Sequence, residues 1–285
     1  MRNFATITAC MLVAGTAGAD LVITEIMQNP AAVTDSNGEY FEVYNSGASA
    51  VDMDGYTIVD NDSDDFVVSG TLLVPAGGYV VFGKSANDTT NGGVAVDYEF
   101  GSSMALANGG DEIVIMDADS LELDRVEWDG GPLFPDPTGA SMSLGCYLAD
   151  NNDGANWFES MLTSYGDGDF GTPGADNEDA IVVTVSDYPD SVSVGTNATF
   201  NVTLENITCG ALTNDAWIHA TGDVVDQTVK TQPGVTLPGM TSSGLVPISL
   251  PVPPSTPLGV YDVDLNVGTL PSDAAWTDGF SATVY

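Results

Sequence analysis

Basic residues are nearly absent from this sequence of 285 residues. It contains 4 Lys and Arg against 41 Asp and Glu, which gives a formal net charge of −37. Binding to nucleic-acid phosphates depends on Lys and Arg that displace counterions, and anionic lipid surfaces attract the same side chains. The composition therefore excludes direct nucleic-acid binding and disfavours anionic membranes. Two compatible interpretations of the acidity remain: solubility in a salty medium, or clustered carboxylates that bind divalent cations.

Histidine occurs once, at His219, inside the apolar stretch Ala216–Ala220. The sequence contains no Gly-x-Ser-x-Gly elbow, no glycine loop that would cradle phosphate, and no Cys/His spacing typical of zinc. A nucleophilic triad needs a base that reaches a serine or cysteine. We therefore expect His219 to be a surface strand residue, and we predict no catalytic residue.

Long hydrophobic runs are also lacking, except at the start of the chain. Arg2 precedes a mostly apolar run from Phe4 to Ala14, and the small residues 17–19 follow it. This layout is typical of a signal peptide, and the run is shorter than the roughly 20 residues of a membrane-spanning helix. We predict a signal peptide over residues 1–19, no membrane insertion, and a secreted protein that is extracellular, at the cell surface or periplasmic. Residues 7–10 also fit a lipoprotein box, but too few residues precede it.

Cleavage after Ala19 changes both the charge and the cysteine count. It removes Arg2 and no acid, so the mature chain carries 3 basic and 41 acidic residues, or −38 (3 − 41). It also removes Cys10 and leaves Cys146 and Cys209 in an oxidising compartment. A disulfide between these two cysteines and a pair of free thiols both fit the sequence.

Helical periodicity is scarce, whereas short β-branched and aromatic runs recur between Gly, Asn, Asp and Pro turns. This pattern is typical of β-sandwiches and barrels, and we predict an all-β protein with two immunoglobulin-like β-sandwich domains. In Tyr40–Tyr44, alternation places Phe41 and Val43 on one face and Glu42 on the other. The predicted strands are Leu21–Met27, Tyr40–Tyr44, Tyr56–Val59, Phe66–Val68, Tyr79–Phe82, Glu112–Met116, Arg125–Trp128, Ile181–Ser186, Ala198–Glu205, Ala216–Ala220, Leu245–Val252, Val260–Val267 and Phe280–Val284.

A short acidic stretch without a hydrophobic pattern separates the two series of strands. We place the first domain at residues 20–174, the linker at 175–180 and the second domain at 181–285. Each of the two predicted domains has the length of an ordinary single domain.

Several motifs of the first domain occur in the order found in the lamin-tail domain of secreted bacterial proteins. The segments are Leu21–Ile26, Gly38–Asn45, Val51–Ile58 and Gly171–Ala175, together with the turn Gly109–Asp111. Over about residues 20–177 the chain resembles that family. The resemblance implies a compact immunoglobulin-like sandwich that serves as an accessory or targeting module. The segment Pro257–Val263 resembles the immunoglobulin-like modules that follow such domains on bacterial surfaces.

Oxygen-rich loops are the candidate metal sites. Asp60, Asp62 and Asp64 alternate along one loop, as ligands do in calcium loops, but Gly and Glu are missing at the positions that the helical calcium motif requires. A second loop holds Asp150, Asn152 and Asp153, and Asp167 with Asp169 forms a third cluster. Calcium is the cofactor that these loops suggest. The alternative is that their side chains form Asx turns in solvated loops.

Three glutamates near the start of the first domain form a second candidate site. Glu25, Glu39 and Glu42 belong to two predicted strands that can pair. Carboxylates brought together can hold a metal or act as acid and base. The alternative, which we favour, is that they point to solvent or make turn hydrogen bonds.

Aromatic residues suggest a carbohydrate platform as a further hypothesis. Core packing is the favoured explanation for most of the aromatics. Trp128 and Trp157 flank Gly- and Asn-rich loops and are the best candidates for exposed rings.

The sequence favours a non-catalytic, secreted or cell-surface-associated binding or structural protein, stabilised by calcium. Its partner would be an extracellular protein or a glycan. The alternative is a calcium-dependent extracellular hydrolase of phosphoesters or glycans, or the accessory domain of one.

Overall fold

The computed structural model describes residues 21–61, 64–270 and 273–285. The predicted signal peptide, Cys10 and Asp62 lie outside these residues. Strands dominate the described chain, and its helical pieces are the single turn α1 (Asp35–Gly38) and the 3-10 turn η1 (Gly154–Asn156). The predicted all-β class with two sandwiches is confirmed. No described helix is long and apolar enough to cross a membrane.

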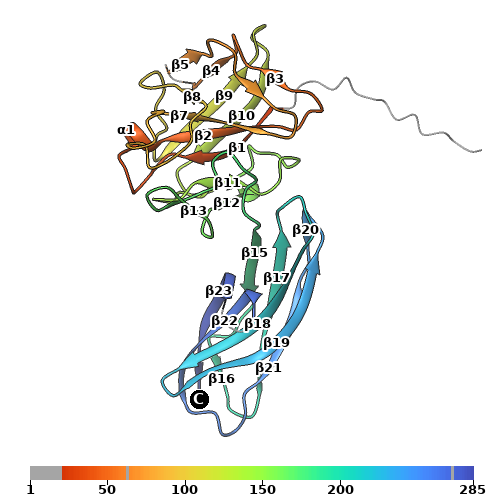
Figure 1. The fold of residues 1–285 in the computed structure, drawn as a ribbon. Helices are drawn as coiled ribbons and strands as arrows, with labels where there is room; N and C mark the ends of the chain where they lie inside the picture. The colour runs from red at the N-terminus through yellow and green to blue at the C-terminus, as the bar shows by residue number, and fades with distance from the viewer. Residues whose placement is uncertain (1–20, 62–63, 271–272) are drawn as a thin grey trace, which may run out of the picture.

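The first group of sheets forms the upper lobe in Figure 1. The strands of its six-stranded sheet, in spatial order, are β12 (Trp157–Glu159), β11 (Met142–Leu144), β1 (Leu21–Met27), β2 (Tyr40–Asn45), β7 (Tyr79–Gly83) and β8 (Tyr98–Glu99). The four-stranded sheet contains β10 (Glu122–Asp129), β9 (Gly110–Met116), β4 (Thr57–Val59) and β5 (Asp65–Val67). Two small ribbons pair β3 (Val51–Asp52) with β6 (Leu73–Val74) and β13 (Ser164–Tyr165) with β14 (Asp169–Phe170).

One hydrophobic core joins the two large sheets of this lobe. Phe41 and Phe82 are completely buried and stack with ring centroids 4.8 Å apart, while Ile113 and Ile115 come from the opposite sheet. The predicted alternation of β2 is confirmed, because Phe41 and Val43 both belong to this core and Glu42 does not. Burial of such side chains contributes about 1.5–3 kcal/mol each.

The second group of sheets forms the lower lobe. One sheet contains β15 (Ile181–Ser186), β17 (Asn197–Asn206), β20 (Thr241–Ser242) and β21 (Val246–Pro251). The other contains, in order, β16 (Ser191–Val192), β23 (Asp273–Val284), β22 (Gly259–Thr269), β18 (Leu212–Gly222) and β19 (Val225–Leu237). Buried residues of β17 alternate strictly with exposed or half-buried ones, as predicted, and they pack against β18 and β22.

The edge strand β19 was not predicted from the sequence. Most of its side chains are exposed on both faces of the sheet, so its sequence lacks the period-2 hydrophobic pattern. It also contains Pro233 and Gly234, a dipeptide that is typical of turns.

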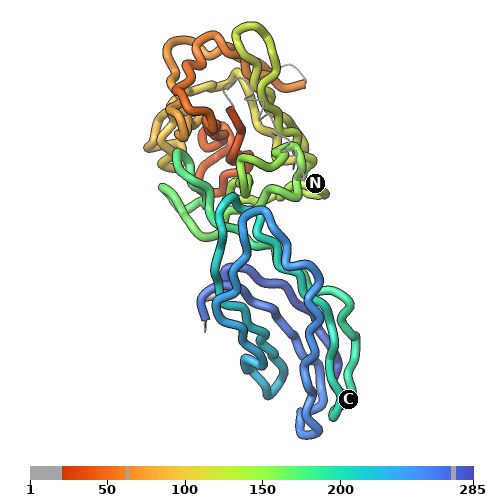
Figure 2. Tube along the Cα trace, turned by 90° about the vertical axis from the view of Figure 1, so that its right-hand side faces the viewer, coloured from red at the N-terminus to blue at the C-terminus, as the bar shows by residue number. Residues whose placement is uncertain are grey.

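The two lobes lie end to end, as two views at right angles show (Figures 1 and 2). A disulfide joins Cys146, which follows β11, to Cys209, which follows β17, with their Cα atoms 4.8 Å apart. The sequence left the state of these cysteines open, and the structure pairs them across the junction between the lobes.

Candidate functional site at the domain junction

Two glutamates on neighbouring strands of the six-stranded sheet are completely buried. Glu25 on β1 is the direct cross-strand partner of Glu42 on β2. A bulge between Ile23 and Glu25 shifts the register, so that Ile23 and Ile26 both face the main core and Glu25 faces away from it. The opposite face of the sheet therefore carries both carboxylates.

The strand β14 and the segment that follows it cover this face. Glu25 Oε1 accepts hydrogen bonds from the hydroxyl groups of Tyr40, at 2.9 Å, and Ser141, at 2.5 Å, and from the backbone N–H of Thr172, at 2.8 Å. Tyr40 also packs edge-on against Tyr165 of β13 at 5.9 Å. The carboxylate thus accepts bonds from three separate parts of the chain.

Glu42 holds the next residues of the same covering segment. Its Oε2 accepts the backbone N–H of Gly174 at 2.6 Å, and its Oε1 accepts the hydroxyl of Thr24 at 2.9 Å. The two glutamates therefore tie residues 172–174, which lead to the second lobe, onto the first.

Burial raises the pKa of both carboxyl groups. The pKa of Glu42 rises to about 9, first because the group is desolvated and second because Glu25 lies beside it. Desolvation also raises the pKa of Glu25, against the opposing effect of its hydrogen bonds from Ser141 and Thr172. Two carboxylates this close in a dry environment cannot both ionise without a large penalty, so we expect the pair to retain a proton at neutral pH.

Of our preferred prediction that Glu25, Glu39 and Glu42 point to solvent or make turn hydrogen bonds, the solvent part is wrong, whereas Glu42 does accept a bond from the turn residue Gly174. Glu25 and Glu42 are completely buried, and Glu39 is 5% exposed. Glu39 forms a salt bridge with Lys84 at 3.2 Å and accepts the backbone N–H of Leu106 at 3.1 Å. The alternation along the strand was predicted correctly, but the face opposite the core is covered rather than solvated.

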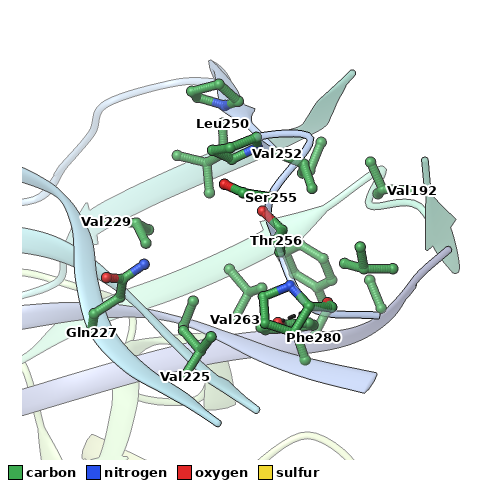
Figure 3. A pocket seen from close by; sticks show the side chains of 18 residues that line it. Val192, Val225, Gln227, Val229, Leu250, Val252, Ser255, Thr256, Val263 and Phe280 are labelled. Atoms are coloured by element: carbon green, nitrogen blue, oxygen red, sulfur yellow. Dashed lines mark hydrogen bonds between the residues drawn. The ribbon is translucent and has the colours of Figure 1, made fainter. Parts of the chain in front are cut away.

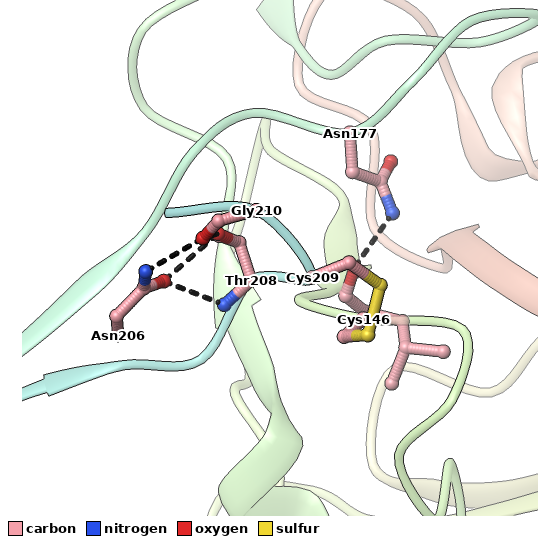
Figure 4. Close-up of a disulfide and its surroundings, with 7 residues drawn as sticks. Cys146, Asn177, Asn206, Thr208, Cys209 and Gly210 are labelled. Carbon is pink, nitrogen blue, oxygen red and sulfur yellow. Dashed lines mark hydrogen bonds between the residues drawn. A yellow bond between two sulfur atoms is a disulfide. The ribbon is translucent and has the colours of Figure 1, made fainter. Parts of the chain in front are cut away.

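The connection between the lobes is held by an amide side chain and by the disulfide (Figure 4). Asn177 donates to the carbonyl oxygens of Thr24, at 2.7 Å, and Leu144, at 3.1 Å. On the other lobe, the buried Asn206 accepts the backbone N–H of Thr208 at 3.0 Å and donates to Gly210 O at 2.8 Å, which shapes the loop that carries Cys209.

A cavity of about 250 Å³ lies at this junction. Tyr44, Tyr79 and Tyr147 line it from the first lobe, and residues 176–179 and 208–210 complete it. The ring centroids of Tyr44 and Tyr79 are 4.8 Å apart, and those of Tyr44 and Tyr147 are 4.9 Å apart. The sequence did not single out Tyr79 or Tyr147, because strand periodicity does not show that a loop from another domain will approach them.

In the loop of Asp60 and Asp64, side-chain oxygens accept backbone hydrogen bonds. Asp60 Oδ1 accepts Asp64 N–H at 3.0 Å, and Asp64 Oδ2 accepts Ala105 N–H at 3.2 Å. Asp111 lies close enough for Asp60 and Asp64 to add to the rise in its pKa, which is due first to burial. The sequence analysis did not connect Asp111 with this loop.

The second predicted calcium loop is built in the same way. Asp150 Oδ1 accepts Asn152 N–H at 3.0 Å, Asp153 Oδ1 accepts Ala155 N–H at 3.1 Å, and Asn152 Oδ1 accepts Glu127 N–H at 2.8 Å. Within residues 21–61, 64–270 and 273–285, no group of three or more His, Cys, Asp or Glu is placed to hold a metal ion. Calcium binding therefore stays a prediction.

In the third acidic cluster, Asp167 is exposed and Asp169 is buried. Asp169 is 4% exposed and accepts the backbone N–H groups of Ala31, at 3.2 Å, and Ala32, at 3.0 Å. It anchors the turn after β1 to β14.

The two tryptophans predicted as a sugar platform are buried. Trp128 is 2% and Trp157 is 4% exposed, and both belong to the main core of the first lobe. Their indole N–H groups donate to the carbonyl oxygens of Ala107, at 3.2 Å, and Asn151, at 2.8 Å. That prediction is wrong, because the neighbouring loops fold over the rings.

His219 lies on β18 and is half-buried, with Nε2 2.6 Å from Asp226 of β19. Its other ring nitrogen is 3.3 Å from the Thr228 hydroxyl. Its partly exposed position on a strand agrees with the predicted surface strand residue.

A second cavity, of about 300 Å³, opens between the two sheets of the lower lobe (Figure 3). Val225 and Val229 of β19 line it together with Leu250, Val263 and Phe280. Few polar side chains line it: Gln227 belongs to the edge strand β19, and Ser255 and Thr256 belong to the loop between β21 and β22. It offers apolar surface without a charged group to orient a ligand.

The fold and the junction define a two-domain, all-β protein in which buried carboxylates hold chain segments in place. Residues 14–130 match the family model described as the Lamin Tail Domain. This match confirms the family resemblance of the first domain and supports a non-catalytic binding or structural role for it. The match ends before β11 and β12, which also belong to the six-stranded sheet. No curated protein matches the chain.

Similar solved structures come from several kinds of protein. A β-glucosidase from Listeria innocua is 14% identical, with a TM-score of 0.32 over 43% of this chain and 19% of the enzyme. A CARDB domain from Pyrococcus furiosus, solved in complex with di-metal ions, is 17% identical, with a TM-score of 0.29 over 38% of this chain and 89% of that domain. The chain spans about a fifth of the length of the enzyme.

Proposed function

We propose that this chain is an exported, non-catalytic binding protein, secreted or held at the cell surface, in which a lamin tail domain and an immunoglobulin-like domain act as one unit. The observation that carries the proposal is the disulfide between Cys146 and Cys209. Disulfides persist in oxidising compartments and are rare in the cytosol. The signal-peptide pattern of residues 1–19 supports the same compartment independently.

The burial of Glu25 and Glu42 argues against a catalytic role for these two residues. A general acid or base must reach the proton that it transfers, and Glu25 and Glu42 expose none of their surface. Their hydrogen bonds run to Tyr40, Ser141 and the segment 172–174 of the same chain. The alternative of a calcium-dependent hydrolase that uses these glutamates has no support in this geometry.

Expression of the full chain in a host that exports proteins tests the proposal. We expect the exported protein to begin at Asp20, to have a mass two hydrogens below that of the reduced chain, and to bind no alkylating reagent until it is reduced. A retained leader together with two alkylated cysteines in the native protein would contradict the proposal.

A panel of phosphoester and glycan substrates tests the absence of catalysis. We expect no product from the mature protein. Product release that is abolished in Glu42→Gln, but kept in a Glu39→Gln control, would overturn the non-catalytic assignment.

Calcium stabilisation remains part of the proposal because oxygen-bearing side chains gather in the loop of Asp150, Asn152 and Asp153. A ligand that binds the native state alone must raise its stability. A melting temperature that is higher in about 1 mM calcium than in chelator supports calcium binding. An unchanged melting temperature contradicts it.

A further inference from the structure

We propose that the cavity at the domain junction binds a quaternary ammonium group, such as the trimethylammonium head of a choline-bearing surface component. This inference rests on the proposed function, since it names the ligand class that such a binding protein would take. The cavity measures about 250 Å³ and lies between the two lobes, where ligand sites commonly occur. It is suited in size to a head group rather than to a large ligand.

Three tyrosine rings line the cavity. Tyr44 lies in the middle, with the rings of Tyr79 and Tyr147 at centroid distances of 4.8 and 4.9 Å. Tyr147 is 37% exposed, so its ring is accessible from solvent. Burial raises the pKa values of Tyr44 and Tyr79, so both rings remain neutral phenols at physiological pH. The faces of such rings carry negative electrostatic potential and attract cations.

Acidic side chains also line the cavity. Asp176, Glu178 and Asp179 line it within four consecutive residues. None of the described residues that line the cavity is Lys, Arg or His. A cation in the cavity would therefore lie near both tyrosine rings and carboxylates, with no positive charge among the described lining residues to repel it.

Two of the three carboxyl groups that line the cavity already accept hydrogen bonds from the protein. Asp176 already accepts the hydroxyl of Tyr79 at 2.5 Å. Glu178 already accepts the backbone N–H groups of Met161 and Leu162, each at 3.0 Å. A primary ammonium would compete with these donors for the same oxygens. A quaternary ammonium donates no hydrogen bond and needs only negative charge and contact with aromatic rings, and the residues that line the cavity supply both.

Titration of the mature, disulfide-bonded full chain with choline tests the proposal by calorimetry and by NMR. The neutral isostere 3,3-dimethylbutan-1-ol has the same shape without the charge, and we expect it to bind at least about ten-fold more weakly, which corresponds to 1.4 kcal/mol. Saturable choline binding that shifts the ring resonances of Tyr44 and Tyr147 supports the proposal.

Two pairs of variants separate ring contact from general attraction to an acidic protein. Tyr147→Ala should weaken choline binding at least ten-fold, whereas Tyr147→Phe, which keeps the ring, should bind within three-fold of wild type. Asp179→Asn should weaken binding, whereas Asp223→Asn, which removes an exposed charge on the hairpin between β18 and β19, should not.

Equal affinity for choline and its isostere, or equal binding by wild type and Tyr147→Ala, would overturn the proposal. So would saturable binding of a neutral sugar in place of choline. If the protein is exported and disulfide-bonded but shows no choline binding, the ligand assignment fails and the proposed function stands. If its cysteines are free in the exported protein, the proposed function fails first.

Discussion

Glu25 and Glu42 lie directly opposite each other on β1 and β2, and both carboxyl groups are completely buried. Each accepts backbone N–H groups from the segment that connects the two domains, Glu25 from Thr172 and Glu42 from Gly174. The protonation of these two carboxyl groups is therefore coupled to the hydrogen bonds that attach the connecting segment to the first domain.

The stability of the first domain should fall as the pH rises. The pKa of Glu42 is about 9 in the folded protein and ordinarily near 4.5, so the folded state binds more protons between these values. The stabilisation from this group is complete below pH 4.5 and is lost as the pH rises toward 9, at about 1.4 kcal/mol per pKa unit at most. Denaturant unfolding at pH 5, 7 and 9 measures this loss.

Glu42→Gln should flatten this pH dependence, because an amide resembles a protonated carboxyl group and does not titrate. We expect the variant to match wild type at pH 5 and to exceed it at pH 9. High salt screens repulsion between surface charges but affects a buried pair much less, so the comparison is made in about 0.5 M salt. Parallel curves for the two proteins would show that Glu42 is not the group responsible.

Glu25→Gln should destabilise the first domain more than Glu42→Gln does at neutral pH. Oε1 of Glu25 accepts from Tyr40, Ser141 and Thr172, and bonds to a charged acceptor are about twice as strong as neutral ones. We expect a loss of about 1–3 kcal/mol. Removing this neighbouring charge should also lower the pKa of Glu42, which NMR titration of the Glu42 carboxyl carbon would detect. A Glu42 pKa that does not change would contradict the coupling.

Trp157→Ala should lower stability by about 3–5 kcal/mol without changing the binding of sugars. Trp157 packs against Phe134 at 6.2 Å and donates to Asn151 O, so its ring fills the core rather than presenting a stacking surface. Leu133→Ala is the control, since Leu133 is 74% exposed and its truncation should change stability by less than about 0.5 kcal/mol. If Trp157→Ala kept the melting temperature of wild type but lost glycan binding, the hypothesis that Trp157 stacks on sugars would be supported instead.

Local patterns in the sequence predicted most of the long strands that pack into a core, but not the short core strands β11 and β12. In β17, Phe200, Val202 and Leu204 alternate with polar residues, and this strand was predicted correctly. The strand β19 was missed because its exposed, polar side chains give no such pattern. An alternating hydrophobic pattern arises when one face of a strand is buried. A strand with neither face buried therefore has no such pattern in its sequence.

That the second face of the six-stranded sheet is covered could not be predicted from a local sequence pattern. Alternation placed Glu42 opposite Phe41 correctly, but Thr172, which covers Glu25, follows it by 147 positions. The disulfide was undecided for the same reason, since Cys146 and Cys209 are 63 positions apart and belong to different domains. Pairings of this range depend on how whole domains pack.

Gly145→Ala should loosen the junction between the domains although the disulfide beside it remains closed. A Cβ atom at Gly145 would lie 2.6 Å from the backbone oxygen of Ile207, in the other domain. Because a backbone atom cannot rotate aside, the domains must shift apart, and we expect a loss of about 1–3 kcal/mol, as in other overpacked sites. Gly210→Ala, in the same region, is the matched control, since its Cβ would meet nothing within 4 Å. Thermal unfolding measures both variants, and an equal melting temperature for Gly145→Ala and wild type would show that this close approach does not hold the domains together.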